Sequence, residues 1–219
     1  MKQFMQATKA KELTLPRGVT VRLVLVRHGE PEDAARGRCY GKLDVGLSEL
    51  GREQVRQTAR WLEKIPIMAI YTSPRRRARE SAAIIATQKR LADVRVEDRL
   101  CEIDFGEFEG MTYDELAMHY PEEYLAWMNR PTEVIFPGGE SFEQMRDRVT
   151  CATTQIRASH TAQTVVLVTH GGVNRIILAE SLRMESRDIF RLDQTYAGIS
   201  MIDYYDGTPL VRLVNYSSV

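Results

Sequence analysis

Two apolar segments that lie far apart in the chain end in nearly the same way. Residues 24–29 read Val-Leu-Val-Arg-His-Gly, and residues 166–171 read Val-Leu-Val-Thr-His-Gly. A strand buried in a parallel sheet is a short apolar run of this kind, and α/β proteins place ligands at the carboxyl ends of such strands. The two segments therefore predict parallel strands that bring His28 and His170 to one edge of the same sheet. Two histidines facing one anion-sized pocket point to phosphoryl chemistry.

The rest of the chain alternates between strand patterns and helix patterns. Strands are expected at 19–26, 67–71, 94–96 and 164–169, with a hairpin or edge pair at 199–204 and 209–214. Helices are expected between Ser48 and Pro66, over 75–91, from Ser141 to about 158, and over 173–182. This alternation predicts an α/β fold: a three-layer α/β/α domain with a mostly parallel central sheet.

One stretch, at about 104–139, breaks the alternation. It holds two short helical patterns, the first opened by a capping box at Thr112–Glu115, and it ends at Pro-Gly-Gly. We interpret it as a small helical cap inserted into a single domain that covers 19–219. Residues 1–18 are expected to be a poorly ordered lead-in.

Composition narrows the class of protein. Thirty basic and thirty acidic residues balance, so no net charge attracts nucleic acid or a membrane surface. No apolar stretch is long enough to span a bilayer, and residues 1–11 lack the apolar core of a signal peptide. Cys39, Cys101 and Cys151 form no CxxC and no metal-ligand pattern, which favours reduced thiols in a cytoplasmic protein. The oligomeric state stays open, a homodimer included.

The residues around the two histidines suit phosphate. A neutral imidazole is a nucleophile when its other ring nitrogen is held as N–H, which a backbone carbonyl in the turn after His28 could do. Arg27 adds a planar cationic fork that matches phosphate oxygens. His170 precedes a helix whose amino end favours an anion, and a protonated His170 would donate to a phosphate oxygen.

Two further roles stay open on spacing alone. A second phosphate-binding arginine could come from the run at 75–79, although most of that run is expected to face water. Breaking a phosphate monoester also requires a proton for the leaving oxygen, which a carboxylic acid can supply. Four carboxylates compete for this role: Glu102, Asp104, Glu107 and Glu109.

At this point the chain resembles the histidine phosphatase superfamily, the phosphoglycerate mutase-like proteins. Six motifs carry the resemblance, in the family's order: Leu-Val-Arg-His-Gly-Glu at 25–30; Tyr40-Gly41 with Asp44, Leu47 and Ser48; Ser73-Pro74 with Arg77-Ala78; Glu102 with Phe105-Gly106 and Glu109-Gly110; Pro-Gly-Gly-Glu-Ser at 137–141; and Val-Thr-His-Gly-Gly at 168–172.

The resemblance implies a role for each matching residue. His28 is the nucleophile that becomes phosphohistidine, and His170 lies opposite it. Arg27 and Arg77 bind phosphate, and Glu102 is the general acid. The remaining matches contact the substrate: Tyr40, Gly41 and Gly171. The family uses no metal and no cofactor, and its substrates are small phosphomonoesters.

The resemblance also narrows the activity. The family's mutases have Thr or Ser, and then Asn, where this chain has Pro31 and Ala34, which weakens a mutase assignment. The segment 37–41 with Asp44 is similar to the α-ribazole phosphatase branch, so α-ribazole 5'-phosphate is one expected substrate. Aromatic residues of the predicted cap, such as Phe108, Tyr113, Tyr124 and Trp127, are expected to shape the leaving-group side or simply to pack. The alternatives are a mutase, a phospho-ligand-binding protein without activity and, more weakly, a metal-dependent hydrolase.

Overall fold

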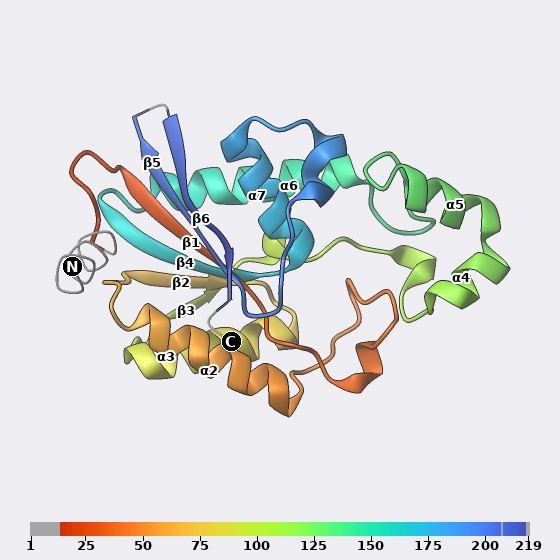
Figure 1. The fold of residues 1–219 in the computed structure, drawn as a ribbon, viewed down its shortest axis with the longest axis horizontal. Helices are drawn as coiled ribbons and strands as arrows, with labels where there is room; N and C mark the ends of the chain where they lie inside the picture. Colours follow the sequence, from red (N-terminus) through yellow and green to blue (C-terminus); the bar gives the residue numbers. More distant parts are fainter. Residues whose placement is uncertain (1–13, 207, 218–219) are drawn as a thin grey trace, which may run out of the picture.

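A twisted sheet runs through the centre of the protein (Figure 1). The structure, a computed structural model, describes residues 14–206 and 208–217, so most of the predicted lead-in lies outside the described residues. The described strands form one sheet in the order β3-β2-β4-β1-β5-β6. They are β1 (Val21–Arg27), β2 (Ala69–Thr72), β3 (Val94–Val96), β4 (Gln163–Thr169), β5 (Ile199–Tyr205) and β6 (Thr208–Tyr216). The first four in that order run parallel, and β5 and β6 run antiparallel as the predicted pair.

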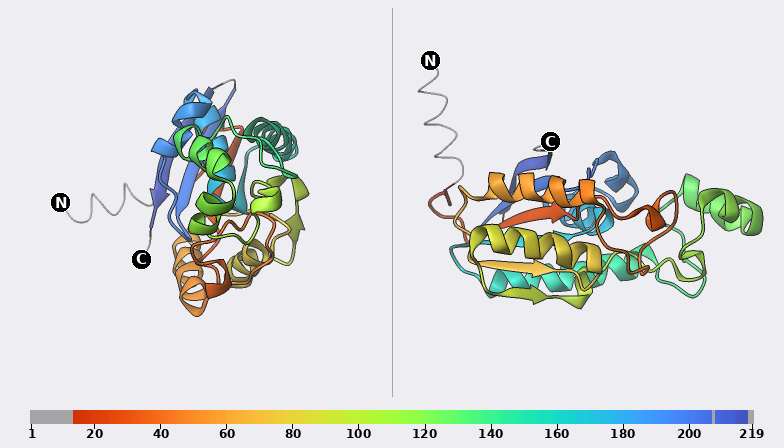
Figure 2. Two further views of the ribbon diagram at one scale, coloured as in Figure 1. Left: turned by 90° about the vertical axis from the view of Figure 1, so that its right-hand side faces the viewer. Right: turned by 90° about the horizontal axis from the view of Figure 1, so that it is seen from below.

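Helices cover both faces of this sheet, which confirms the predicted α/β class. They are α2 (Glu49–Leu62) and α3 (Arg76–Lys89) on one face, and α6 (Phe142–Ala158) and α7 (Gly171–Leu182) on the other. The right-hand view of Figure 2 shows α2 and α3 lying side by side over the sheet, with their axes running along the strands.

Side-chain alternation along β1 explains the two helical layers. Leu23 and Leu25 belong to the apolar cluster that includes residues of α6 and α7. Val24 and Val26 belong to the cluster that includes residues of α2 and α3. Successive side chains of a strand point to opposite faces, so an unbroken apolar run supplies both cores. This is the physical reason for the apolar runs in the sequence.

Polar side chains mark where the helices begin. Ser48 accepts a hydrogen bond from the backbone N–H of Gly51 at 2.9 Å and starts α2. Thr112 with Glu115, and Ser141 with Gln144, form the two predicted capping boxes, at α4 (Tyr113–His119) and α6. These contacts satisfy backbone N–H groups that have no partner within the helix.

The segment 104–139 carries α4 and α5 (Pro121–Asn129), which lie beyond the end of the sheet, in green at the right of Figure 1. Phe108, Leu116 and Phe136 are buried there with Cys39, and a ring of aromatic side chains surrounds them. This cap therefore has an apolar cluster of its own. Short 3-10 helices complete the described elements: η1 (Asp33–Ala35), η2 (Asp98–Leu100), η3 (Gly106–Phe108) and η4 (Ser186–Arg191).

Candidate active site

The pairing of β1 with β4 brings the two histidines together. Arg27 lies opposite Thr169 in the parallel register, so His28 and His170 follow neighbouring strands at the same level. The backbone N–H of His28 donates to the carbonyl of Thr169 at 2.9 Å. The two ring centroids are 5.2 Å apart, and both rings are buried. The structure thus places the two histidines at the sheet edge where their sequence context predicted them.

His28 is held in the state that a nucleophile needs. Its Nδ1 lies 2.7 Å from the carbonyl oxygen of Gly29, so an Nδ1–H donates to that oxygen and Nε2 keeps its lone pair. Burial lowers the pKa of His28 well below its usual value, and the positive charges of Arg77 and Arg27 lower it further. His28 is therefore neutral at neutral pH, with Nε2 free to attack.

Gly29 is required by the packing of α2 rather than by backbone strain. A Cβ at Gly29 would lie 2.3 Å from the carbonyl oxygen of Gly51, in the first turn of α2. Only glycine permits this approach. The amino end of α2 is thereby kept close to the turn that holds His28.

His170 differs from the sequence expectation. Burial is the main cause that lowers its pKa well below the usual value, and the positive charges of Arg77, Arg27 and Arg75 lower it further. Burial and these charges therefore favour the neutral ring of His170 over the protonated one. Its Nε2 lies 2.8 Å from the hydroxyl oxygen of Ser73. Its Nδ1 is buried and has no hydrogen-bond partner within the described part of the chain.

Of the arginine run, the structure selects Arg77. Its side chain is fully buried and donates to the carbonyl oxygens of Tyr40 (2.8 Å), Gly41 (3.0 Å) and Leu43 (2.9 Å). These three contacts fix the guanidinium at the start of α3, and its Nε stays buried without a partner among the described residues. The pKa of Arg77 is lowered by burial, yet an arginine remains charged.

The other three arginines of the run differ in how far they are exposed. Arg76 and Arg79 are exposed, as the sequence predicted. Arg75 is only half-exposed, and its charge is one of the causes that lower the pKa of His170, so the prediction that it faces water is wrong in part. Arg75 follows the turn at Ser73-Pro74, which keeps its backbone near the site.

Arg27 reaches the same site from the end of β1. One of its Nη groups donates to the backbone carbonyl of Gln194, and the other lies 3.4 Å from the hydroxyl of Tyr40. The guanidinium carbon lies 4.1 Å from the ring centroid of Tyr196. Its Nε is buried without a described partner. Arg27 and Arg77 each therefore present an unused N–H group inside the protein, which an anion can accept.

Of the four candidate carboxylates, Glu102 is the one that lies beside His28 and lines the same cavity. Its two oxygens accept hydrogen bonds from the backbone N–H groups of Ile103 and Gly172, both at 3.0 Å. A Cβ at Gly172 would lie 2.3 Å from Oε1 of Glu102, so a larger residue there would displace this carboxylate. The contact joins Glu102 to the first turn of α7, directly after His170.

The three competing carboxylates are used elsewhere. Asp104 pairs with Lys42 at 2.6 Å, and Glu107 accepts a hydrogen bond from Tyr120 at 3.1 Å. Glu109 accepts from the backbone N–H groups of Lys42 and Leu43. It orders the loop whose carbonyls hold Arg77. None of the three lines the cavity at His28 among its described lining residues.

Two cavities near His28 share lining residues. We call the one that His28 lines, of about 120 Å³, the inner cavity, and the other, of about 390 Å³, the outer cavity. Arg27, Arg38, Tyr40 and Tyr113 line both. The inner cavity is further lined by His28, Cys39, Arg77, Glu102 and Phe105. The outer one is further lined by Glu30, Pro31, Ala35, Arg36, Gly37 and Tyr196.

The predicted substrate residues take different positions. Tyr40 lines both cavities, and its hydroxyl lies 2.9 Å from that of Tyr196. Burial is the main cause that raises the pKa of Tyr40. Gly41 packs so closely on the backbone of Ile103 that a Cβ would lie 1.7 Å from its carbonyl oxygen. Gly171 begins α7 between the arginine side chains at 27 and 175.

Of the four cap aromatics, only Tyr113 lines the cavities; Phe108, Tyr124 and Trp127 pack in the cap cluster. The sequence analysis missed Ser73 as a partner of His170. It also missed Tyr196, which lies between η4 and β5 and stacks on Arg27. Ser73 ends the neighbouring strand β2, which could have indicated it. No sequence signal marks Tyr196.

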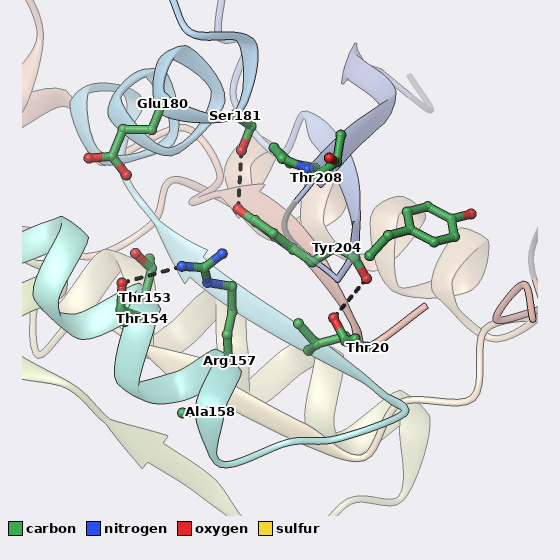
Figure 3. Close-up of a pocket in the computed structure, with 12 residues that line it drawn as sticks. Thr20, Thr153, Thr154, Arg157, Ala158, Glu180, Ser181, Tyr204 and Thr208 are labelled. Atoms are coloured by element: carbon green, nitrogen blue, oxygen red, sulfur yellow. Dashed lines mark hydrogen bonds between the residues drawn. The ribbon is translucent and has the colours of Figure 1, made fainter. Parts of the chain in front are cut away.

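A third hollow lies at the opposite end of the strands (Figure 3). Its volume is about 460 Å³, and its lining includes Thr20 and Val21, at the amino end of β1. Arg157 stacks on the Tyr204 ring there, 4.3 Å from its centroid, and Thr20 and Ser181 bond to Tyr204. No histidine or cysteine is among its described lining residues. This hollow is separate from the site at His28.

None of the helices in 14–206 and 208–217 is both long and apolar enough to cross a membrane. Within the same residues, no three His, Cys, Asp or Glu side chains are grouped as a metal site would need.

The chain belongs to the histidine phosphatase superfamily, since the model of its branch 1 matches residues 23–217. A bifunctional protein of Mycobacterium tuberculosis is 36% identical over 201 residues, covering 91% of this chain and 55% of that protein. The chain therefore spans about half the length of this relative. Phosphoserine phosphatase 1 of Hydrogenobacter thermophilus is 41% identical over 150 residues, covering 68% of this chain and 71% of that enzyme.

Solved structures share the fold. The α-ribazole phosphatase of Shigella flexneri superposes with a TM-score of 0.82 at 26% identity, covering 89% of this chain and 96% of that one. Mycobacterial glucosyl-3-phosphoglycerate phosphatase superposes with a TM-score of 0.81 at 29% identity, covering 90% of this chain and 99% of that one.

Proposed function

We propose that the chain is a phosphomonoester hydrolase that works through a phosphohistidine at His28. The observation that carries the proposal is the state of this residue. Its Nδ1 is committed to the Gly29 carbonyl, and its Nε2 has no recorded partner among the described residues, beside the buried Arg77 and the half-buried Arg27. A neutral nucleophile among fixed positive charges suits attack on an anionic phosphorus centre.

In the first step, Nε2 of His28 bonds to phosphorus while the bond from phosphorus to the leaving oxygen breaks. The leaving oxygen takes a proton from the carboxylic acid form of Glu102, and the alcohol departs. Arg27 and Arg77 stabilise the charge on the equatorial oxygens through their buried Nε–H groups, which have no partner within the described residues.

In the second step, water enters where the alcohol was. Glu102, now ionised, removes a proton from the water, and the oxygen bonds to phosphorus as the bond to Nε2 breaks. Inorganic phosphate leaves, and both His28 and the acid form of Glu102 are restored. The arginines supply the charge that a metal ion would otherwise supply, so we propose that the reaction needs no metal and no cofactor.

The leaving group would occupy the outer cavity, whose volume of about 390 Å³ far exceeds that of serine. Three tyrosine rings line it, at 40, 113 and 196. Its rim arginines already have acidic neighbours: Arg36 lies 3.2 Å from Asp33, and Arg38 lies 3.7 Å from Glu115. An alcohol that is large and contains a ring therefore fits the outer cavity better than a small alcohol that carries a carboxylate, such as serine. We propose α-ribazole 5'-phosphate as the first substrate to test.

The test is a panel of phosphomonoesters: α-ribazole 5'-phosphate, sugar phosphates, phosphoserine and p-nitrophenyl phosphate, each with wild type and His28→Asn, and with and without a chelator. Hydrolysis by wild type, resistant to chelation and lost in His28→Asn, supports the proposal. Comparable hydrolysis by His28→Asn contradicts it. Phosphate transfer from a bisphosphate to phosphoglycerate, faster than hydrolysis, would favour a mutase. Vanadate binding without turnover of any ester would favour a binding protein.

A further inference from the structure

The second histidine has a partner that the proposed mechanism leaves unused. Ser73 follows the last residue of β2, and His170 follows the last residue of β4, the strand beside it. Both side chains are fully buried, and the Ser73 hydroxyl oxygen lies 2.8 Å from Nε2 of His170. The two groups therefore share one proton in a place that water does not reach.

The neighbours of Ser73 favour one direction for this hydrogen bond. The hydroxyl oxygen already accepts the backbone N–H of Arg75, at 3.3 Å. Among the described hydrogen bonds of Ser73, Nε2 of His170 is the one partner that can accept the hydroxyl proton, and it does so when the ring carries its proton on Nδ1.

We infer that Ser73 is a positioning residue that holds neutral His170 with Nδ1–H as a donor toward the phosphoryl group. Nδ1 is buried and lacks a partner within the described residues, which would cost stability if no ligand ever bound it. The inference rests on the proposed function, because a phosphoryl oxygen is the acceptor that it supplies.

The opposite tautomer would hinder the reaction. If Nε2–H donated to Ser73, the bare lone pair of Nδ1 would face the phosphate oxygens and repel them. The Ser73 contact therefore removes the need for a protonated His170. Both rings then carry their proton on Nδ1, but they use it differently. Nδ1–H of His28 donates to the backbone carbonyl of Gly29, whereas Nδ1–H of His170 is left for the phosphoryl group.

The tautomer is measured directly by NMR of protein labelled with ¹⁵N-histidine. The chain has four histidines, so each signal is assigned by removing one residue at a time. In wild type near neutral pH we expect His170 as the Nδ1–H form, the minor form of free histidine. Observation of His170 as the Nε2–H form overturns the inference, whatever the activity.

Variants connect the tautomer to catalysis. Ser73→Ala should shift His170 toward the Nε2–H form, leave His28 unchanged, and lower kcat/KM roughly 10- to 100-fold, as for other partners that orient a working histidine. Ser73→Thr keeps a hydroxyl and should restore both readouts. Thr153→Ala, which removes a buried hydroxyl beside the hollow of Figure 3, is the matched control.

The failures are distinguishable. If Ser73→Ala keeps the wild-type tautomer and rate, the role assigned to Ser73 is wrong while the phosphohistidine mechanism stands. If no phosphoryl group ever forms on His28, the proposed function fails, and the NMR result then describes a structural contact alone. Should Ser73→Ala fail to fold, the wild-type spectrum and Ser73→Thr still decide the matter.

Discussion

Glu102 and Gly172 are joined by a hydrogen bond of 3.0 Å across 70 positions of sequence. The bond fixes the proposed acid to the amino end of α7, one residue after Gly171 and two after His170. The proposed acid on the leaving-group side and His170 on the phosphate side are therefore both held at the amino end of α7. Movement of this helix end would disturb both.

Replacement of Glu102 by Gln should affect poor leaving groups most. An alkyl alcohol needs a proton as it departs, whereas p-nitrophenolate leaves without one. We expect Glu102→Gln to lower kcat/KM, which reports the first step, roughly 100-fold or more with an alkyl phosphate, a typical size for lost general acid catalysis, and much less with p-nitrophenyl phosphate. Steady-state kinetics with both esters measures the difference. Equal losses with the two would argue against an acid role.

Arg77→Lys should lower kcat/KM by about 100-fold, comparable to the loss of one donor to a developing oxyanion. Lysine cannot hold three backbone carbonyls and still present a further N–H to phosphate. Arg79→Lys, at an exposed position of the same helix, is the control and should match wild type. A loss of similar size in both variants would indicate damage to α3 rather than to the site.

The acid limb of the pH–rate profile should lie below pH 6.5, the ordinary pKa of histidine. His28 must be neutral to attack, and burial and the two arginines lower its pKa. Rates should therefore hold as the pH falls through 6.5 and decline only when His28 protonates. Arg27→Met removes one of the lowering charges and should move this limb to higher pH. If the acid limb stays at the same pH in Arg27→Met, measured with the same ester, the charge of Arg27 does not lower the pKa of His28 as we expect.

The histidine positions could be predicted because each follows a buried strand, and a buried parallel strand leaves an unmistakable apolar run. The capping boxes at Thr112 and Ser141 could also be predicted, because each depends only on residues three positions apart in the sequence. Arg77 could be chosen from its run only by family resemblance, since burial depends on how α3 packs. Tyr196 could not be predicted at all, because its place depends on the path of the loop before β5.

The protonation state of His170 could not be predicted from the sequence, for a related reason. A histidine beside a helix start suggests a charged donor, but the sequence does not show four positive or ionisable neighbours or a buried hydroxyl. Those come from three other segments of the chain, around residues 27, 73 and 77. Electrostatics that depend on long-range packing are therefore the part that only the structure supplies.

The buried pair Arg22–Asp203 should matter for stability rather than for catalysis. It joins β1 to β5, both side chains are fully buried, and one Nη lies 2.8 Å from Oδ2 of Asp203. Asp203→Asn removes the carboxylate that pairs with the buried Arg22, and breaking a buried ion pair from one side costs about 3–5 kcal/mol of unfolding free energy. Glu53→Gln, in an exposed pair on α2, should change little. Urea unfolding of both variants checks this, and similar midpoints would refute it.

The most direct test of the central claim is to trap the phosphoenzyme. Wild type mixed with a ³²P-labelled ester and quenched in base within a turnover should carry label that is stable to base and lost in acid. Peptide mapping should place it on His28. His28→Asn should carry none, while Glu102→Gln given labelled p-nitrophenyl phosphate should retain more, because its first step needs no acid and its second step is slow. Label on another residue, or turnover without any acid-labile label, would show that the reaction does not pass through His28.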